Sequence, residues 1–563
     1  MIARVVIAIV ILALATATYP GAVAVSMAIR LTPPPAAPSP APSGQLPWLH
    51  VEHRQGMTPY IADDQGRLVL LHGAIPASLL EFGKDDHSPP SSPPVYPIDP
   101  AAYEGSCPST SDASRYPPLC QTDLTQMAAL GFNSLRLPLS WSLLEPDRDR
   151  FSEPYLARIA QVVDWARALG IYVIIDIHQN AYSPFIPSGD GVNLAYHSGA
   201  PAWATLTDGI QSKVYLKNQR EANPAVFQAF SNFWYNRNGI QDAYIAALGF
   251  LAKRFKDDST VVGYSIFNEP QPGWNLPPGF EDLLLFPFYR RVIDALTGIH
   301  DGLPCPTGIY MPAVCGYADL GIQDRRHLFF LEPGLLRQIT DFPTHLGMPV
   351  SSYPNLVYDI HDYTHVYTIE ALLKPDADPR QATYPWGGYE QTYTFGMREA
   401  KAMEAALFVS EFGGNPKDDS LLLANELLQQ EKYLTGFAFW AWKENSGGKW
   451  GVYDPEDKGG CLRTARERLL ARVYPRASGD PSLRYHYEPD TGGFRLTGNG
   501  RAGDPPTVIF IPFQVRGSVA VSGTAAPETT TGVDGSRLVA ASPSGGPFSI
   551  AVAPSPVALT GCG

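Results

Sequence analysis

Continuous apolar runs alternate with longer amphipathic stretches over most of the chain. The apolar runs are RLVLLHG (67–73), FNSLRLPLSW (132–141), IYVIIDIH (171–178), VVGYSIFNEP (261–270), HLFFLEPG (327–334), NLVYDIHDY (355–363), ALFVSEFGG (406–414) and GFAFWAWKE (436–444). Near-continuous apolar runs are typical of parallel strands that are buried on both faces. Eight such runs separated by helical stretches predict an α/β fold in which the strands close into a (β/α)8 TIM barrel.

The stretches between the runs show helical periodicity. In ARIAQVVDWARALG, the residues Ile159, Val162, Val163 and Ala166 fall on one face, and Gly170 supplies a helix end. An open doubly wound sheet is the alternative arrangement of such elements. It is less favoured, because no glycine-rich phosphate turn follows the first apolar run.

The pattern changes after about residue 476. The segments LRYHYEPDTGGFRLTG, TVIFIPF, VAVSG and FSIAVAP are short, alternate in polarity and are bounded by Gly, Pro and Asp. This pattern predicts a small antiparallel β-sandwich. We therefore expect a catalytic barrel over residues 48–475 and a C-terminal β-sandwich domain over residues 476–563.

The first residues have the pattern of an export signal. Arg4 precedes an apolar run from Val5 to Ala15, and Ala22-Val23-Ala24 follows a Tyr-Pro-Gly break. This predicts a cleaved signal peptide over residues 1–26, followed by a Pro/Ala/Ser linker over residues 27–47. An uncleaved signal anchor is the alternative, because apolar residues continue to Ile29. Either way, we expect the folded part to be secreted or extracellular.

The cysteines and the net charge restrict the chemistry further. Six cysteines in an exported chain predict disulfides, and their order along the chain suggests the pairs Cys107–Cys120, Cys305–Cys315 and Cys461–Cys562. A net charge of -13 excludes nucleic acid as an electrostatic partner, but it permits a neutral sugar or a glycolipid and transient contact with a membrane surface. No metal-binding spacing is present, so we expect no metal and no cofactor. We expect a monomer.

Polar residues follow or end most of the apolar runs. They are His72, Arg136, His178, Asn268, Glu269, Glu332, His361, Tyr363, Glu411 and Trp440. A barrel brings the carboxyl ends of all its strands to one mouth, where the active site of this fold lies. In IFNEPQPG, a proline directly after Glu269 ends the run, so that Asn268 and Glu269 project into that mouth. The set predicts a polar catalytic pocket.

Two carboxylates on either side of a bond are what glycoside hydrolysis requires. Glu269, Glu332 and Glu411 compete for these two roles. Asn268 can contact a sugar 2-hydroxyl and Tyr363 can donate a hydrogen bond to a carboxylate nucleophile, which favours Glu269 and Glu411 only weakly over Glu332. Trp440 offers an apolar platform for a sugar ring.

Several motifs resemble one enzyme family. IFNEPQPG, VSEFGG, GFNSLRLPLSW, DIHQNAYS, HDY and FAFWAWK are similar to the retaining β-glycosidases of glycoside hydrolase family 5. HQNAYS, GAPAWA, NFWYNRNGIQD and PPTVIFIP resemble its endoglycoceramidase branch. The resemblance extends over roughly residues 60 to 550 and implies hydrolysis of the bond between sugar and ceramide in glycosphingolipids.

The same resemblance implies roles for individual residues. Glu269 matches the general acid/base and Glu411 matches the nucleophile. The sugar subsite next to the cleaved bond would be lined by Arg136, His178, Asn268, His361, Tyr363 and Trp440. Glu332 would then be a structural or secondary group.

Two segments depart from the endoglycoceramidase pattern. The first strand continues as HGAIPASLLEFG, without the G-x-N-x-x-x-K motif, and Asn180 replaces the usual Asp. Both lie in sugar-recognition loops, so the resemblance implies the chemistry more strongly than the substrate. A β-glucanase or another family 5 glycoside hydrolase is the first alternative. A non-catalytic carbohydrate-binding protein on the same barrel is the second.

Overall fold

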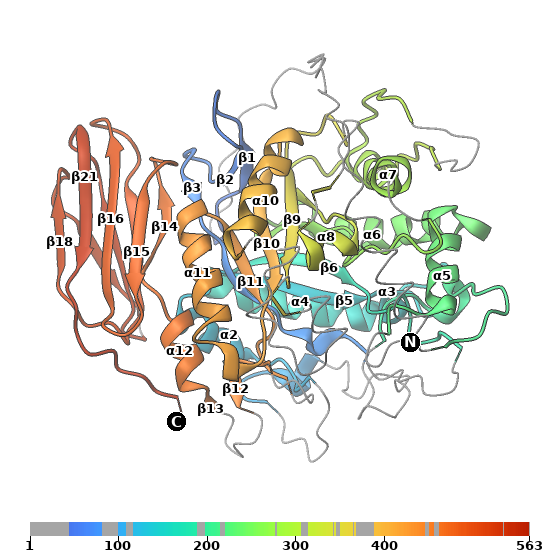
Figure 1. The fold of residues 1–563 in the computed structure, drawn as a ribbon, viewed down its shortest axis with the longest axis horizontal. Helices are drawn as coiled ribbons and strands as arrows, with labels where there is room; N and C mark the ends of the chain where they lie inside the picture. The colour runs from blue at the N-terminus through green and yellow to red at the C-terminus, as the bar shows by residue number, and fades with distance from the viewer. Residues whose placement is uncertain are drawn as a thin grey trace.

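The computed structural model describes residues 44–81, 100–107, 116–187, 197–213, 220–275, 279–305, 314–341, 343–344, 350–363, 365–366, 388–444, 450–454, 461–532 and 534–561. Eight parallel strands form a closed barrel in the order β4 to β11. Figure 1 labels β5, β6, β9, β10 and β11 among them. They are β4 (His72–Ala74), β5 (Ser134–Ser140), β6 (Tyr172–His178), β7 (Val261–Ser265), β8 (Leu328–Leu331), β9 (Leu356–Asp362), β10 (Ala406–Phe412) and β11 (Gly436–Phe439). The predicted TIM barrel is confirmed.

Helices surround the barrel and connect its strands. The α-helices are α2 (Gln121–Leu130), α3 (Trp141–Leu144), α4 (Glu153–Ala168), α5 (Pro224–Trp234), α6 (Ile240–Phe255), α7 (Phe286–Thr297), α8 (Leu335–Thr340), α10 (Glu390–Ala402), α11 (Leu422–Tyr433) and α12 (Thr464–Leu470). Helix α4 contains the predicted helical stretch. Its apolar face is buried as expected, and Gly170 follows its end with a left-handed φ of 70°.

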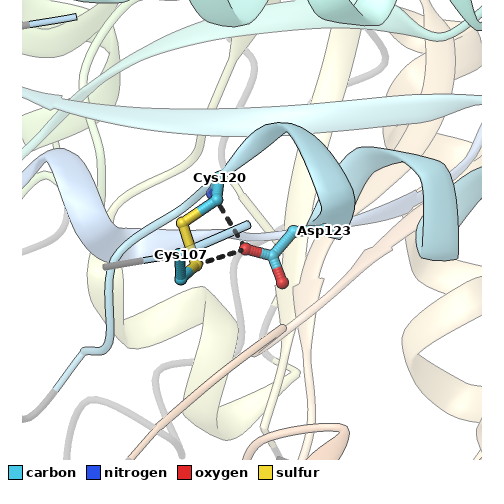
Figure 2. A group of neighbouring side chains, drawn as sticks. All are labelled: Cys107, Cys120 and Asp123. Carbon is cyan, nitrogen blue, oxygen red and sulfur yellow. Dashed lines mark hydrogen bonds between the residues drawn. A yellow bond between two sulfur atoms is a disulfide. The ribbon is translucent and has the colours of Figure 1, made fainter. Parts of the chain in front are cut away.

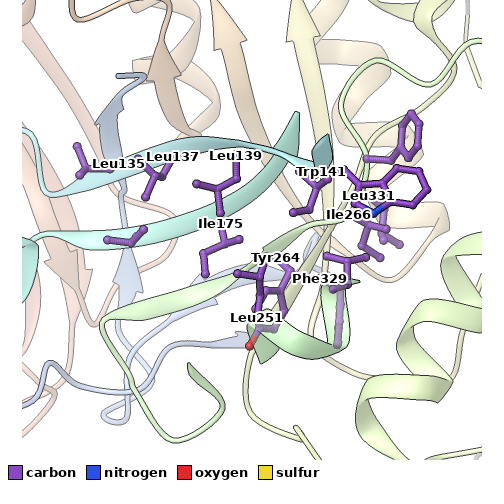
Figure 3. Packing of buried hydrophobic residues seen from close by; sticks show 14 of the residues in the cluster. Leu135, Leu137, Leu139, Trp141, Ile175, Leu251, Tyr264, Ile266, Phe329 and Leu331 are labelled. Atoms are coloured by element: carbon purple, nitrogen blue, oxygen red, sulfur yellow. The ribbon is translucent and has the colours of Figure 1, made fainter. Parts of the chain in front are cut away.

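Successive side chains of each barrel strand point alternately toward the surrounding helices and toward the barrel interior, so the core has two layers. On β6, Val173, Ile175 and Ile177 belong to the large cluster beneath the helices. Leu135, Leu137 and Leu139 of β5 belong to the same cluster, as do Leu251 of α6 and Phe329 of β8 (Figure 3). The other face of each strand lines the barrel interior, and this face carries the polar residues described below.

A β-sandwich lies beside the barrel, at the left of Figure 1. Its seven-stranded sheet has the order β1-β2-β3-β14-β17-β20-β19, and its four-stranded sheet has the order β15-β16-β21-β18. The C-terminal strands are β14 (Tyr474–Ser478), β15 (Arg484–Glu488), β16 (Gly493–Gly500), β17 (Thr507–Ile511), β18 (Val519–Ser522), β19 (Glu528–Thr531), β20 (Arg537–Ala541) and β21 (Gly546–Val552). A further pair, β12 (Tyr453–Asp454) and β13 (Cys461–Leu462), follows the barrel.

Three N-terminal strands join this sandwich and not the barrel. They are β1 (His50–Glu52), β2 (Tyr60–Ala62) and β3 (Leu68–Val69), and β3 pairs with β14 through Val69 and Ala477. The run RLVLLHG, which we expected as one barrel strand, is therefore divided between β3 in the sandwich and β4 in the barrel. The sequence pattern does not reveal the boundary between the two strands, because the residues on both sides of it are buried and apolar.

These N-terminal strands also close one end of the barrel. Leu49, Val51 and Ile61 belong to the same buried cluster as interior side chains of the barrel, among them Phe330 and Phe408. This apolar contact seals the end at which the strands begin. Among the described residues, the ion-paired groups Arg136, Asp176, Glu332 and Glu411 lie toward the other end, where the strands finish.

Two of the predicted disulfides, Cys107–Cys120 and Cys305–Cys315, are present. Cys461 is also disulfide-bonded, while its expected partner Cys562 lies outside the described residues, so that pairing stays a prediction. The signal peptide lies outside them too, as does all of the linker but its last four residues, 44–47. Within the described part of the chain, none of the helices has the length and apolar character needed to cross a bilayer.

Candidate active site

The polar residues predicted from the strand ends meet at the carboxyl end of the barrel. Arg136 and Glu411 lie on β5 and β10, and His361 lies on β9. Asn268 and Glu269 follow β7, which already ends at Ser265. Contacts described below connect all of the predicted site residues. His72 is the exception among the strand-end residues, because it begins β4 and stacks on Tyr474 at 3.8 Å, outside this cluster.

Glu411 is held by two donors. Arg136 Nη1 donates to Glu411 Oε2 at 2.7 Å, and the Tyr363 hydroxyl donates to Oε1 at 2.7 Å. Glu411 is buried, so its charge is compensated by these contacts and not by water. A carboxylate fixed in this way has the geometry of a nucleophile.

Glu269 occupies a different environment. It lies on a turn with a φ of 45°, which non-glycine residues rarely adopt. Its side chain keeps 18% of its surface exposed, and Oε1 is 3.2 Å from His361 Nδ1. The backbone N–H of Glu269 donates to Glu332 Oε2 at 2.8 Å. Partial exposure suits a group that exchanges a proton with a leaving group and with water.

The two carboxylates are close to each other. One oxygen of Glu269, one oxygen of Glu411 and a ring nitrogen of His361 all lie within 4.8 Å of one another. Carboxyl groups of retaining glycosidases lie about 5 Å apart, whereas inverting enzymes need about 6.5–9.5 Å for a water molecule. The spacing fits a retaining pair.

Two buried cations lie between the acidic groups. Burial alone would lower the pKa of Arg136, but Asp176, Glu332 and Glu411 raise it above its ordinary value. Burial likewise acts to lower the pKa of His361, but Glu332 and Glu411 raise it well above the usual range. His361 is therefore an imidazolium at neutral pH, positioned between the two candidate catalytic carboxylates.

Asn268 and His178 are tied into the same network. Arg136 Nη2 donates to Asn268 Oδ1 at 2.7 Å, and Asn268 Nδ2 donates to the Gln179 carbonyl at 3.0 Å. His178 Nδ1 lies 2.9 Å from Asp176 Oδ2, and its ring stacks on Trp440 with 5.6 Å between centroids. Asp176 is fully buried, and although burial raises its pKa, Arg136 and His178 bring it below the ordinary value.

The loop that carries Trp440 is supported from the first helix of the barrel. Asp123 accepts a hydrogen bond from the indole of Trp442 at 3.0 Å and pairs with Lys443 at 2.5 Å. Figure 2 shows Asp123 beside the Cys107–Cys120 disulfide, where it also accepts from the Cys120 backbone N–H at 2.8 Å. Both sulfurs are used in the disulfide, so this group does not provide a metal site.

The strand-end interpretation missed three interior residues. Asp176 and Asp359 stand two residues before His178 and His361, so the period of a strand places each pair on one face. That spacing was a signal that could have revealed them. Burial and the nearby Glu332 raise the pKa of Asp359 to about 8, so it is protonated at neutral pH. Gln179, the third, contacts the turn of Glu269 and gave no such signal.

The apolar residues that follow β6 and β7 separate into two groups. Leu284, Leu285 and Phe288 of FEDLLLFPFY are buried and belong to the core. In contrast, Trp274 is 51% exposed after β7 and Phe185 is 43% exposed after β6. These two residues remain available at the carboxyl end of the barrel.

Comparisons with known proteins find similarity to glycoside hydrolases. The family model "Cellulase (glycosyl hydrolase family 5)" matches residues 109–301. Endoglycoceramidase I of Rhodococcus hoagii (strain 103S) is 26% identical over 443 residues, which are 75% of this chain and 80% of that protein.

Solved structures with a similar fold include enzymes of the same kind. A crystal structure of an endogalactoceramidase has a TM-score of 0.69 at 26% identity and covers 90% of this chain and 100% of its own. Endo-glycoceramidase II from Rhodococcus sp. in complex with ganglioside GM3 has a TM-score of 0.64 at 23% identity, over 89% of this chain and 99% of that one, and shares the fold.

Proposed function

We propose that this chain, which is similar to endoglycoceramidases of glycoside hydrolase family 5, is a secreted retaining β-glycosidase that cleaves the bond between sugar and ceramide in glycosphingolipids. The observation that carries the retaining mechanism is the proximity of Glu269 and Glu411, whose oxygens lie within 4.8 Å. The two residues also differ in the way this mechanism requires. Glu411 is buried between two donors, and Glu269 is partly exposed.

The proposed reaction is a double displacement. Glu411 attacks the anomeric carbon, the bond from that carbon to the aglycone oxygen breaks, and Glu269 gives its proton to the departing oxygen. Glu269 then takes a proton from water, which attacks the glycosyl-enzyme ester and releases both the sugar and Glu411.

Other residues support these steps. Arg136 and Tyr363 keep Glu411 oriented toward the anomeric carbon. We propose that Asn268 contacts the sugar 2-hydroxyl and that the stacked pair of Trp440 and His178 forms a wall of the subsite. All of these steps use side chains of the chain itself.

The lipid part of the proposal rests on Trp274 and Phe185. Both aromatic side chains are exposed on segments that follow β7 and β6, as Glu269 follows β7, and so offer apolar surface at the same end of the barrel. Each CH2 group of a ceramide tail that is buried there contributes about 0.8 kcal/mol. The Rhodococcus relative, whose name states activity on glycoceramides, supports the same substrate class.

Sugar choice is a separate question that involves Asn180. Its Oδ1 accepts from Arg220 at 2.8 Å and its Nδ2 donates to Ser198 Oγ at 3.2 Å. Both ends of the amide are therefore occupied by the protein, and we propose that Asn180 shapes the sugar loop and does not itself bind a hydroxyl. An Asp at this position would instead pair with Arg220.

The decisive experiment compares kcat/KM for fluorescent glucosyl- and galactosylceramide with kcat/KM for cello- and laminari-oligosaccharides. We expect release of ceramide with a β-configured sugar product. Faster cleavage of the oligosaccharides without ceramide release would instead identify a β-glucanase. Absence of hydrolysis of every substrate would favour a binding protein.

Secretion is tested separately. The two disulfides support an oxidising location for the folded chain. Expression of the full chain with its N-terminal segment should place processed enzyme outside the cytoplasm. A membrane-bound product of unprocessed mass would instead identify the segment as an anchor.

A further inference from the structure

The turn that carries Glu269 is not in a relaxed conformation. Strand β7 ends at Ser265, and four residues later Glu269 has a φ of 45°, directly before Pro270. A left-handed conformation at a non-glycine residue costs on the order of 1–3 kcal/mol and persists only where neighbouring groups hold it. The groups that hold this turn therefore determine where the Glu269 carboxylate points.

The turn is held from two sides. On the β6 side, Gln179 Nε2 donates to the carbonyls of Asn268 at 2.9 Å and Glu269 at 3.1 Å. On the β8 side, Glu332 Oε2 accepts from the Glu269 N–H at 2.8 Å, and the Leu335 N–H donates to the Pro270 carbonyl at 2.9 Å. Of these contacts, only the one to Glu332 is made by a charged group.

Glu332 also contacts the residues around both catalytic carboxylates. Its Oε1 lies 2.8 Å from Arg136 Nη2 and 3.3 Å from His361 Nε2, and Gln338 Nε2 donates to its Oε2 at 3.0 Å. The side chain is completely buried. Every one of its partners is a donor or a cation, which is an environment that only an anionic carboxylate satisfies.

We infer that Glu332 is a positioning residue for Glu269, holding its backbone directly and its carboxylate through His361. The inference rests on the proposed function, since it concerns the group that acts as general acid. Glu332 sets the direction of Glu269 toward the leaving oxygen and has no contact of its own with the reacting atoms.

The variant Glu332→Gln tests this role. The side chain keeps its size, but its NH2 group must face either Arg136 and His361 or the Glu269 N–H and Gln338, and all of these donate. The variant Glu332→Asp keeps the charge but is one CH2 shorter, so it cannot reach both sides. Asp359→Asn is the matched control, because Asp359 is equally buried in the barrel interior, but its side chain accepts from Ser265 Oγ at 3.4 Å and is not among the groups that hold the Glu269 turn.

The experiment compares two aglycones on the same sugar. An alkyl glycoside needs protonation of its leaving oxygen, whereas a 2,4-dinitrophenyl glycoside leaves without it. General acid catalysis contributes about 10²–10⁴-fold, so we expect Glu332→Gln to lower kcat/KM for the alkyl glycoside about 100-fold and for the dinitrophenyl glycoside less than about fivefold. Glu332→Asp should show the same selectivity with a smaller loss.

Several results would overturn the inference. Equal losses on both substrates would mean that Glu332 acts through stability or through Glu411. The same selective loss in Asp359→Asn would mean that any change in the buried charges has this effect. Failure of both Glu332 variants to fold would show a purely structural role. If the wild-type protein cleaves neither glycoside, the proposed function itself fails, which is a different outcome from an active wild type with unselective variants.

Discussion

The two ends of the barrel have opposite character. At the carboxyl end, the interior contains Arg136, Asp176, Glu332 and Glu411 within one network of ion pairs. At the other end, apolar side chains of β1 and β2 seal the interior. A buried charge is costly, so it is retained only where it is compensated or used. The comparison shows one end built for chemistry and the other for stability.

Two buried histidines, His72 and His361, have pKa values that are shifted in opposite directions. Burial, reinforced by the charges of Arg472 and Arg476, lowers the pKa of His72 well below its ordinary value. For His361, Glu332 and Glu411 outweigh burial and raise the pKa well above it. Burial therefore favours the neutral form of His72, whereas the carboxylates around His361 favour its cationic form.

The largest expected effect is a loss of activity from a change at the carboxyl end of the barrel, which we call the open end. Glu411→Ala removes the proposed nucleophile and should lower kcat by about 10⁴-fold or more, with a small change in the melting temperature. Added azide should restore some turnover of an activated substrate and give a product of inverted configuration. If Glu332→Ala behaves in this way and Glu411→Ala does not, the assignment of the two carboxylates is wrong.

The sealed end should respond in the opposite manner. Ile61→Ala leaves a cavity where β2 closes the barrel, and it should lower the free energy of unfolding by about 2–4 kcal/mol. We expect kcat/KM to change less than about threefold. Urea unfolding and steady-state kinetics on the same preparation measure both quantities, and a large kinetic defect would contradict the division between the two ends.

The histidines should affect the pH dependence of stability with opposite signs. The pKa of His72 is lower in the folded state than the unfolded value near 6.5, so its contribution is present above pH 6.5 and is lost as the pH falls. His72→Phe should therefore stabilise the protein relative to wild type increasingly below pH 6.5, by up to about 1.4 kcal/mol per pH unit.

The contribution of His361 to stability depends on pH with the opposite sign. Its pKa is raised in the folded state, so its contribution is present below pH 6.5 and is lost as the pH rises through the folded value. His361→Gln should remove stability at acidic pH and less at alkaline pH. Melting curves between pH 5 and 9 measure both variants, and parallel curves for the two would contradict the comparison.

The smallest effect concerns the proposed lipid contact. Trp274→Ala removes an exposed indole that rests edge-on against Phe227 with 5.2 Å between centroids. We expect KM for a glycosylceramide to rise about fivefold, equivalent to roughly 1 kcal/mol, and kinetics on a short aglycone to stay unchanged. An equal change on both substrates would remove Trp274 from the lipid site.

Much of the barrel could be predicted because its strands are buried on both faces, and such strands are visible as apolar runs. The pairing of β3 with β14 could not, because it joins residues about 400 positions apart and leaves no local pattern. Strand β7 also ends earlier than the run VVGYSIFNEP suggests. Past Ser265 only single backbone bonds to the neighbouring strands are described, such as Ile266 N–H to the Phe330 carbonyl at 3.2 Å, and Ile266 and Phe267 are buried.

The residues of the candidate site also separate into those that the sequence predicts and those that it does not. The strand-end rule found Arg136, Glu411 and their neighbours, since the topology alone brings them together. It did not find the contacts of Glu332 or Gln179, because these depend on how the loops after β6, β7 and β8 meet. Sequence reasoning locates residues on elements, whereas the partners of a buried carboxylate are set by the tertiary structure.

The seven-stranded sheet has a consequence for how the chain acquires its structure. Strands β1 to β3 emerge from the ribosome first, yet β3 has no partner on its outer side until β14 has been made. During that interval, the apolar residues that close the barrel lack part of their final support. Completion of this sheet therefore waits for a pairing between residues far apart in the chain, which is the kind of contact that slows folding.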